Sequence, residues 1–367
     1  MTPFFLSKTY HRLLPVIRQL PLHWQVKIAA MGRGYFMQNF VVAPKKIPYI
    51  PEDKLSIKMW GIDFRAPLAN AAGMFKNGEG YDVVASLGAG AYIGGTSTAN
   101  SRLGNSKLGI KTPFISLPKA HIAINWLGLP NYGDKILSQK TLTKNKIKGC
   151  PIGWSLMKSP DYTEKDGLTQ LIESLWLYQD NLQIDFIEIN ESCPNIKLSG
   201  ASIIPRLEQI ATKFLAQRQR NLPVIVKLPP DLNEDNLEVL VTELVRLNYD
   251  GINIGNSSTI YNDVRQYINS TDYPIFDYFT TEFGGGCSGI ALKEKSLALG
   301  KSAVKIVEKL NPSQEFHVIR TGGIDSATDL EKSRQAGISF NQWYTGFFDN
   351  YNEAGENVYA NLFALVN

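Results

Sequence analysis

Short apolar runs alternate with amphipathic segments along most of the chain. Most of these runs end at or beside a glycine, an amide or a hydroxyl residue, as strands do where they leave a sheet. The segments between them repeat apolar residues at helical spacing. The predicted strands span residues 68–72, 91–94, 152–156, 186–190, 224–228, 251–254, 317–320 and 340–344, and the predicted helices include 168–181, 205–219, 236–247 and 293–310.

Strands separated by helices predict a parallel sheet, and this pattern belongs to the α/β class. Eight such units fit a closed (β/α)8 barrel, the TIM barrel, better than an open doubly wound sheet. The chain has 367 residues, a length that such barrels reach as one domain. We therefore expect residues 52–367 to form a single barrel. The stretch 100–143 lacks helical periodicity and is expected to be an insertion over the barrel mouth.

The first 51 residues differ from the rest in charge. They contain lysines and arginines but no acidic residue before Glu52, and apolar side chains lie between the bases at roughly helical spacing. Pro15 and Pro21 are expected to divide this extension, residues 1–51, into short helices. The proline-rich link 43–51 then marks the boundary with the barrel.

Three interpretations of this extension are open. A basic amphipathic helix pair lies naturally on an anionic membrane surface, with its apolar face down. A helical lid or appendage that packs on the barrel is the second interpretation. A cleaved transit peptide is the third, because such peptides are also poor in acids and rich in arginine.

The overall composition argues against several function classes. The net charge is only +4, which gives a nucleic-acid role no whole-chain support. Cys150, Cys193 and Cys287 lie far apart without a CxxC pair, which argues against a disulfide framework and a zinc site and for a reducing compartment. The 4 histidines have no metal-ligand spacing. No apolar run approaches the roughly 20 residues that span a bilayer.

The strand 186–190 ends in an unusual concentration of reactive groups. Its apolar alternation stops at the segment 190–195, NESCPN, which contains two amides, a hydroxyl and the thiol of Cys193. The end of a barrel strand is where enzymes of this fold keep their chemistry. We therefore expect the other strand ends to build a site that faces Cys193.

Glycines follow the last two predicted strands. Gly322 and Gly323 come directly after Thr321, and Gly346 follows Tyr344 and Thr345. Glycines let backbone N–H groups approach a phosphate, and the N-terminus of a following helix adds partial positive charge. In barrels this corner is a frequent phosphate site. The segment 284–289, GGGCSG, can add a third set of donors, so the pattern favours a phosphate-bearing cofactor.

Two lysines and several amides stand at other predicted strand ends. Lys227 closes an apolar run, where a lysine is costly unless it meets a partner, and Lys76 follows the first strand. An amide offers both a donor and an acceptor, so converging amides suit a planar ring with alternating carbonyl and N–H groups. The amides are Asn125, Asn190, Asn195, Asn253 and Asn256, the last followed by Ser257 and Ser258.

From about residue 55 to its end, the sequence resembles the dihydroorotate dehydrogenase family, the flavin enzymes of pyrimidine synthesis. Seven motifs occur in the order of the family, which makes the resemblance specific. They are NAAG at 70–73 with KNGE at 76–79, Asn125 with GLPN at 128–131, NESCPN at 190–195, KLPP at 227–230, GGCSG at 285–289, GG at 322–323 and YT at 344–345.

The resemblance implies an FMN cofactor and the substrate pair dihydroorotate and orotate. It implies that the FMN phosphate lies at the glycine corner and that two lysines lie near the flavin ring. The implied cofactor-binding residues are Ala72, Gly73, Lys76, Thr96, Asn190, Lys227, Asn253, Ser288, Gly289, Gly322, Gly323, Tyr344 and Thr345. The implied substrate-binding residues are Lys76, Asn125, Gly128, Leu129, Asn190, Asn195, Asn256 and Ser257.

Cys193 occupies the position of the catalytic base in the family. It would remove the proton at C5 of dihydroorotate while a hydride passes from C6 to N5 of the flavin. The pKa of an unperturbed thiol is about 8.5, so only a few per cent is thiolate at neutral pH. Turnover is therefore expected to climb with pH as the thiol ionises.

The chain combines features of two classes of the family. Membrane-bound members that use quinones have a serine base, an N-terminal helical extension and a lysine placed as Lys76, whereas soluble members have a cysteine base like Cys193. We give the extension more weight than the cysteine, because a helical extension changes the architecture whereas serine and cysteine differ by one substitution. We expect a peripheral membrane enzyme at the cytoplasmic face that reduces a quinone. The alternatives are a soluble cytoplasmic member that uses fumarate or another acceptor, a flavoenzyme for related dihydropyrimidines or enones, and a silent FMN-binding relative.

Two charged residues depart from the family pattern near the site. Glu191 stands where the family has an aliphatic residue, and Arg320 stands where it has a small one. We expect Glu191 to pair with a base such as Arg320 or Lys197. If Glu191 and Arg320 lined the pocket instead, they could admit a different ring.

Overall fold

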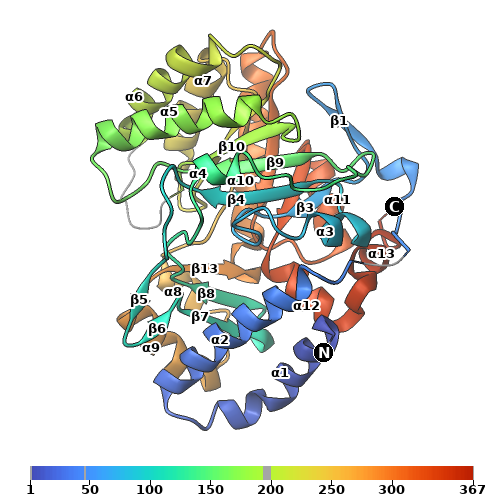
Figure 1. Ribbon diagram of the computed structural model, residues 1–367, viewed down its shortest axis with the longest axis vertical. Coiled ribbons are helices and arrows are strands. Elements are labelled where there is room, and N and C mark those ends of the chain that lie inside the picture. The colour runs from blue at the N-terminus through green and yellow to red at the C-terminus, as the bar shows by residue number, and fades with distance from the viewer. Residues whose placement is uncertain (1, 45–46, 193–199, 367) are drawn as a thin grey trace.

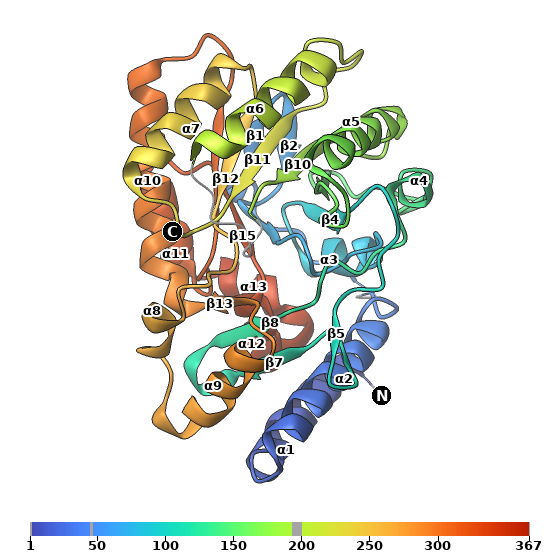
Figure 2. The ribbon, with the colours of Figure 1, turned by 90° about the vertical axis from the view of Figure 1, so that its left-hand side faces the viewer.

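A computed structural model describes residues 2–44, 47–192 and 200–366. Its centre is a parallel eight-stranded sheet that closes into a barrel (Figures 1 and 2). The strands follow one another in the order β3, β15, β14, β12, β11, β10, β9 and β4, and a parallel bridge between Ala69 and Ala91 joins the two ends. The predicted TIM barrel is confirmed. Its strands are β3 (Leu68–Asn70), β4 (Tyr92–Ser97), β9 (Ile152–Leu156), β10 (Phe186–Asn190), β11 (Val224–Leu228), β12 (Gly251–Ile254), β14 (His317–Thr321) and β15 (Phe340–Trp343).

Helices surround the barrel and begin where side chains satisfy their first N–H groups. Thr163 and Asn233 accept from the backbone N–H of the residue three positions later, and Ser326 forms a capping box with Asp329. The helix expected at 205–219 begins earlier and includes Pro205, and it continues as a π-helical turn, Ala211–Leu215. The helices are α3 (Tyr81–Leu87), α5 (Glu164–Asp180), α6 (Gly200–Ile210), α7 (Glu234–Arg246), α10 (Lys293–Leu310), α11 (Ala327–Gln335), α12 (Thr345–Ala354) and α13 (Val358–Phe363).

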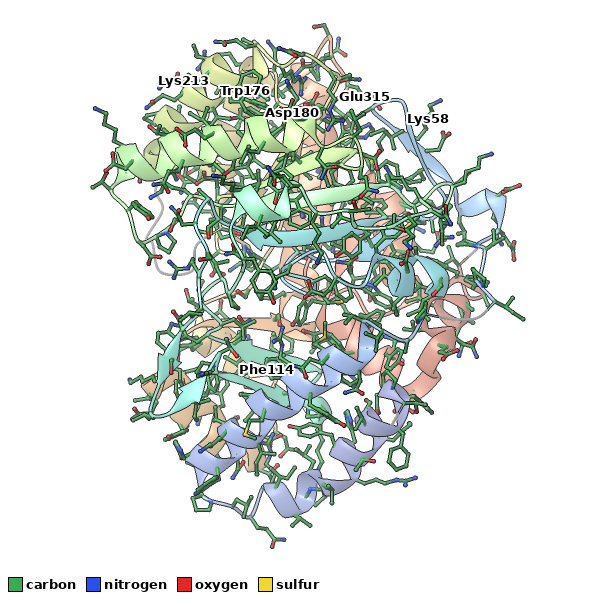
Figure 3. The ribbon with its side chains drawn as sticks, viewed as in Figure 1. Lys58, Phe114, Trp176, Asp180, Lys213 and Glu315 are labelled. Carbon is green, nitrogen blue, oxygen red and sulfur yellow. The ribbon has the colours of Figure 1, made fainter. Side chains whose placement is uncertain are left out.

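An apolar layer closes the end of the barrel at which the strands begin. A short antiparallel hairpin, β1 (Ile57–Met59) and β2 (Ile62–Phe64), brings Trp60 and Phe64 against this end of the strands. Their rings pack on Phe186, which points into the barrel with Ile225 and other residues of the same cluster. Glu315 beside this hairpin accepts from the backbone N–H of Trp60 at 2.7 Å (Figure 3). The barrel is therefore solid at this end, and only its other end is open to a ligand.

A second layer covers the open end of the barrel. The stretch expected to be an insertion over the mouth contains β7 (Phe114–Leu117) and β8 (Ile122–Asn125), and β8 pairs with β13 (Gly286–Gly289) to make a three-stranded antiparallel sheet. Ile115, Ile124 and Phe279 belong to its own apolar cluster, distinct from the main core. The remaining elements of this region and its surroundings are β5 (Ser106–Lys107), β6 (Ile110–Lys111), α4 (Asp134–Leu137), α8 (Tyr261–Arg265) and α9 (Tyr273–Glu282).

The N-terminal extension forms two antiparallel helices, α1 (Pro3–Ile17) and α2 (Leu22–Phe40), which lie side by side against this second layer (Figures 1 and 2). Pro21 lies at the start of α2 as expected, but Pro15 lies inside α1, so the expectation that it breaks the helix is wrong. Pro15 falls in the last turn, where little helix remains to be disrupted. Within the described residues, no helix is both long and apolar enough to cross a bilayer.

Candidate active site

The open end of the barrel holds a cavity of about 260 Å³ between the strand ends and the β7–β8–β13 sheet. Both predicted sets of site residues meet there. Cys193 and Asn195 lie outside the described residues. Among the described residues of the two sets, Asn253 does not line the cavity. The predicted residues that do are Ala72, Gly73, Lys76, Thr96, Asn125, Gly128, Leu129, Asn190, Lys227, Asn256, Ser257, Ser288, Gly289, Gly322, Gly323, Tyr344 and Thr345.

One corner of the cavity is built of backbone rather than side chains. Gly289 and Gly323 have positive φ angles of 113° and 73°. A Cβ atom on Gly289 would lie 2.0 Å from the carbonyl oxygen of His121, and one on Gly346 would lie 2.1 Å from that of Ile324. The chain is therefore packed too tightly for side chains here, and α12 begins at this point. Backbone N–H groups and a helix N-terminus suit a phosphate.

Acidic residues that the sequence analysis missed also face this corner. Asp325 and Asp349 line the cavity, and each has a basic side chain beside it. Nζ of Lys293 lies 2.6 Å from Asp325, and Nδ1 of His121 lies 3.0 Å from Asp349. Burial raises the pKa of Asp349, and the neighbouring His121 opposes that shift. These pairs limit the repulsion that a phosphate would otherwise meet, and no motif in the sequence signals them.

The floor of the cavity is polar although it lies deep in the barrel. Lys227 is buried, and its Nζ donates to Oε1 of Gln342 at 3.3 Å and lies 3.6 Å from Oε1 of Glu188. The partner that a lysine in this strand requires is thus present. Asn253 lies in the same network: its Nδ2 donates to Glu188 at 2.7 Å, and its Oδ1 accepts from Thr321 at 2.8 Å. Both polar atoms of the Asn253 amide are therefore hydrogen-bonded below the cavity, and the amide does not face the cavity.

Lys76 approaches the cavity from the loop after β3. Burial, and next the positive charge of Arg33, lower its pKa to about 7, while Glu79 opposes the shift. Arg33 lies on α2, and its Nη2 donates to the hydroxyl of Tyr344 at 3.1 Å. The extension therefore contributes charge to the cavity wall, which the sequence analysis did not anticipate.

Amides and hydroxyls converge on the side of the cavity formed by β4, β10 and β12. Nδ2 of Asn190 donates to Oγ1 of Thr96 at 3.2 Å. Its Oδ1 accepts from the backbone N–H of Ser192 at 3.2 Å and from Nδ2 of Asn256 at 3.4 Å. Nδ2 of Asn125 donates to the carbonyl of Gly286 across the sheet at 3.4 Å. These contacts hold the amide planes around one space, as a planar heterocycle requires.

Glu191 and Arg320 do not line the cavity. Glu191 pairs with a base, as expected, but that base is Arg206 rather than Arg320, and Lys197 lies outside the described residues. Glu191 forms a buried ion pair with Arg206, whose Nε lies 2.9 Å and 3.0 Å from the two carboxylate oxygens. Arg320 is fully buried and donates to the hydroxyls of Ser296 and Ser333, each at 2.9 Å. Neither residue reaches the space in which a substrate would bind, so neither is placed to select the ring.

Comparison with known proteins identifies the family of this chain. The profile of the dihydroorotate dehydrogenase family matches residues 54–363. The chain belongs to the dihydroorotate dehydrogenase family. The family is flavin-dependent, and a phosphate corner joined to an amide-lined cavity accords with a flavin nucleotide. Among the residues that the structure describes, no group of three or more His, Cys, Asp or Glu side chains could hold a metal ion.

Curated relatives in this family are named dihydroorotate dehydrogenase (quinone). The protein of Bordetella parapertussis is 28% identical over 334 residues, which cover 88% of this chain and 87% of the relative. That of Idiomarina loihiensis is 28% identical over 301 residues, which cover 79% and 82%. That of a Synechococcus strain is 26% identical over 333 residues, which cover 89% and 82%.

Solved structures share the fold. The dihydroorotate dehydrogenase of Eimeria tenella in complex with ferulenol has a TM-score of 0.73 and 21% identity, and the comparison covers 91% of this chain and 89% of that one. Its ligand-free form has a TM-score of 0.71 and 20% identity, with coverages of 92% and 93%. In both comparisons the likeness covers more than nine-tenths of this chain.

Proposed function

We propose that this protein oxidises dihydroorotate to orotate with a bound FMN and passes the electrons to a quinone. The observation that carries this proposal is the convergence of two lysines and three amides on one cavity that ends in a glycine corner. The lysines are Lys76 and Lys227, and the amides are Asn125, Asn190 and Asn256. Membership of the family makes dihydroorotate the substrate to test first.

FMN is the flavin that we propose for this cavity. The backbone at Gly289, Gly323 and Gly346 would hold its single phosphate, and Ser288 and Thr345 add hydroxyls whose oxygens lie 2.9 Å apart. FMN supplies a two-electron acceptor for a hydride when it is bound. The lysines would lie at the edge of its ring, where they favour the negative charge that reduction brings.

The amides would hold the substrate against the flavin. A pyrimidine ring presents alternating carbonyl and N–H groups, and each amide matches one of each. Cys193, outside the described residues, is proposed as the base that takes the C5 proton. Ser192 beside it is buried and donates its backbone N–H to Asn190, so the chain that leads to Cys193 is held by a residue of the substrate site.

The extension is proposed to form a separate cap, residues 1–51, that admits a quinone and rests on a membrane surface. Apolar side chains are exposed along both helices: Phe5 and Leu13 are each 51% exposed, and Met31 is 67% exposed. Arg33 contacts Tyr344 at the cavity wall and lies over the ring of Phe114. An acceptor is proposed to reach the flavin along α2, beside Arg33 and Tyr344. Peripheral association with the cytoplasmic face of a membrane follows from this proposal.

A soluble enzyme that uses fumarate or another acceptor is the second candidate. The cysteine in the base position favours it, because membrane-bound members of the family carry serine there. Both candidates predict the same first half-reaction, so only the acceptor separates them.

An anaerobic experiment tests the proposed reaction and its acceptor. Dihydroorotate is expected to bleach the oxidised flavin, and a soluble quinone, rather than fumarate, is expected to restore its colour. Cys193→Ala should slow the bleaching by orders of magnitude while FMN stays bound. A Cys193→Ala rate near that of the wild type would remove Cys193 from the mechanism, and reoxidation by fumarate alone would favour the second candidate.

Flotation with anionic vesicles tests the membrane surface. The variant Phe5→Ser/Leu13→Ser/Met31→Ser should lose most of its vesicle binding while it keeps its flavin. A matched control is Leu182→Ser/Val239→Ser, which removes exposed apolar residues after α5 and on α7, at the far end of the barrel (Figure 1). Equal binding of both variants would contradict the proposed surface.

A further inference from the structure

Beneath the cavity lies a buried carboxylate that the proposed reaction does not use. Glu188 is fully buried in the middle of β10, and the sequence places it two residues before Asn190, on the same face of the strand. It does not line the cavity, whereas Lys227 does. The ammonium of Lys227 therefore lies between this carboxylate and the space that the flavin would fill.

The contacts of Glu188 hold its carboxyl group in one position. Its Oε2 accepts from Nδ2 of Asn253 at 2.7 Å and from Nε2 of Gln342 at 2.9 Å. Its Oε1 has no hydrogen-bond partner among the described residues, and Nζ of Lys227 lies 3.6 Å from it. Two amide donors and a neighbouring ammonium suit a carboxylate.

The same residues also hold the position of Lys227. Gln342 donates to Glu188 through its Nε2 and accepts from Lys227 through its Oε1, so it joins the two charges. Oγ1 of Thr321 donates to Asn253 at 2.8 Å and lies 3.2 Å from Oε1 of Gln342. Strands β10, β11, β12, β14 and β15 thus contribute to one closed polar network. Such a network is costly unless its members are satisfied, which indicates a role beyond packing.

We propose that Glu188 is a positioning residue that fixes Lys227 under the flavin and offsets its charge. The inference rests on the proposed flavin site. Charges interact strongly in a buried region because little solvent screens them. An isolated ammonium at this position would favour the reduced flavin, which carries more negative charge. With Glu188 present, the floor is neutral overall, and the reduced flavin gives up its electrons more readily.

The reduction potential of the bound flavin tests this role. Glu188→Gln keeps the shape of the side chain and removes its charge. The ratio of reduced to oxidised flavin at a given potential should rise at least tenfold, which is about 30 mV for a two-electron couple. Removing Lys227 as well, in Glu188→Gln/Lys227→Gln, should return the potential to the wild-type value or below it. A purely structural role for Glu188 would not produce this reversal.

A matched control and a second variant sharpen the test. Glu191→Gln makes the same substitution at another buried glutamate, whose partner Arg206 lies outside the cavity, and should leave the ratio within about twofold. If Glu188→Gln does not fold, Glu188→Asp withdraws the carboxylate from Lys227 and should give a smaller rise. An unchanged or lower potential in the Glu188 variant that folds, or a rise that persists in the double variant, would overturn the inference.

The proposed reaction is tested independently by the reduction of the flavin with dihydroorotate. A wild-type protein that binds flavin but is not reduced by dihydroorotate would refute the proposed substrate. The potentials of the Glu188 and Lys227 variants would still decide the role of Glu188, because they are measured with a chemical reductant.

Discussion

Breaking the buried ion pair between Glu191 and Arg206 is predicted to cause a large loss of stability. The two side chains are only 6% and 8% exposed, and Arg206 makes three N–H contacts with the carboxylate. Burial lowers the pKa of Arg206, but its hydrogen bonds to Glu191 and Glu164 outweigh this and raise it, so the guanidinium is held as a cation. Arg206→Met would leave the Glu191 carboxylate buried without this partner.

Removing one member of a buried pair costs about 3–5 kcal/mol, whereas replacing both members with apolar residues is often nearly neutral. Arg206→Met should therefore lower the free energy of unfolding by about 3–5 kcal/mol. Glu191→Leu/Arg206→Met should lie within about 1 kcal/mol of the wild type. An aliphatic residue at position 191 is also what the family pattern favours, so leucine there suits the fold.

Urea unfolding of the four proteins of this double-mutant cycle, followed by tryptophan fluorescence, measures the coupling between Glu191 and Arg206. A lone Glu191→Leu variant should lose less than Arg206→Met, because Arg206 keeps its contact with the more exposed Glu164. The reasoning would be refuted if Arg206→Met cost less than about 1 kcal/mol, or if the double variant were as unstable as that single variant.

Two further perturbations test the buried lysine and the extension. Burial lowers the pKa of Lys76 to about 7, so between this value and the ordinary 10.5 the unfolded chain binds more protons than the folded one. The stability of flavin-free protein should thus rise across that pH range by at most about 5 kcal/mol, and Lys76→Met, followed by urea unfolding at several pH values, should remove the rise. Phe40→Ala should cost about 3–5 kcal/mol in the same unfolding assay, whereas Phe5→Ala on the exposed face of α1 should cost little.

The strand ends were predictable because polar residues interrupt apolar runs there. Lys227 and Asn190 each close a run of buried residues, and in a parallel barrel all such ends meet at one rim. What the sequence could not show is the height of each side chain within the barrel. Asn253 follows the same pattern, yet its register beside Lys227 places its amide in the network beneath the cavity. That height depends on the stagger between strands, which is a property of the closed barrel.

Charged residues inside strands were the other gap. Glu188 interrupts the run 186–190 with a carboxylate, and this interruption was a signal that the sequence analysis did not use. A carboxylate at an inward position is costly unless a cation or donors surround it, so it implied a partner such as Lys227. The partner of Glu191 was harder to predict, because Arg206 lies on a helix and many bases are available on helices.

The two helices of the extension differ in how they pack on the rest of the protein, and this difference bears on the class of enzyme. In α1 the only buried residue is Pro3, whereas α2 buries Val26 and Phe40, and the Phe40 ring packs 5.3 Å from that of Tyr351 within the main core. Cleavage after residue 51 would remove this packing, which argues against the transit-peptide interpretation. Because Arg33 of α2 contacts Tyr344, which lines the cavity, α2 adjoins the site as well as the core. The packing of α2, more than the length or charge of the extension, therefore supports the proposed quinone acceptor.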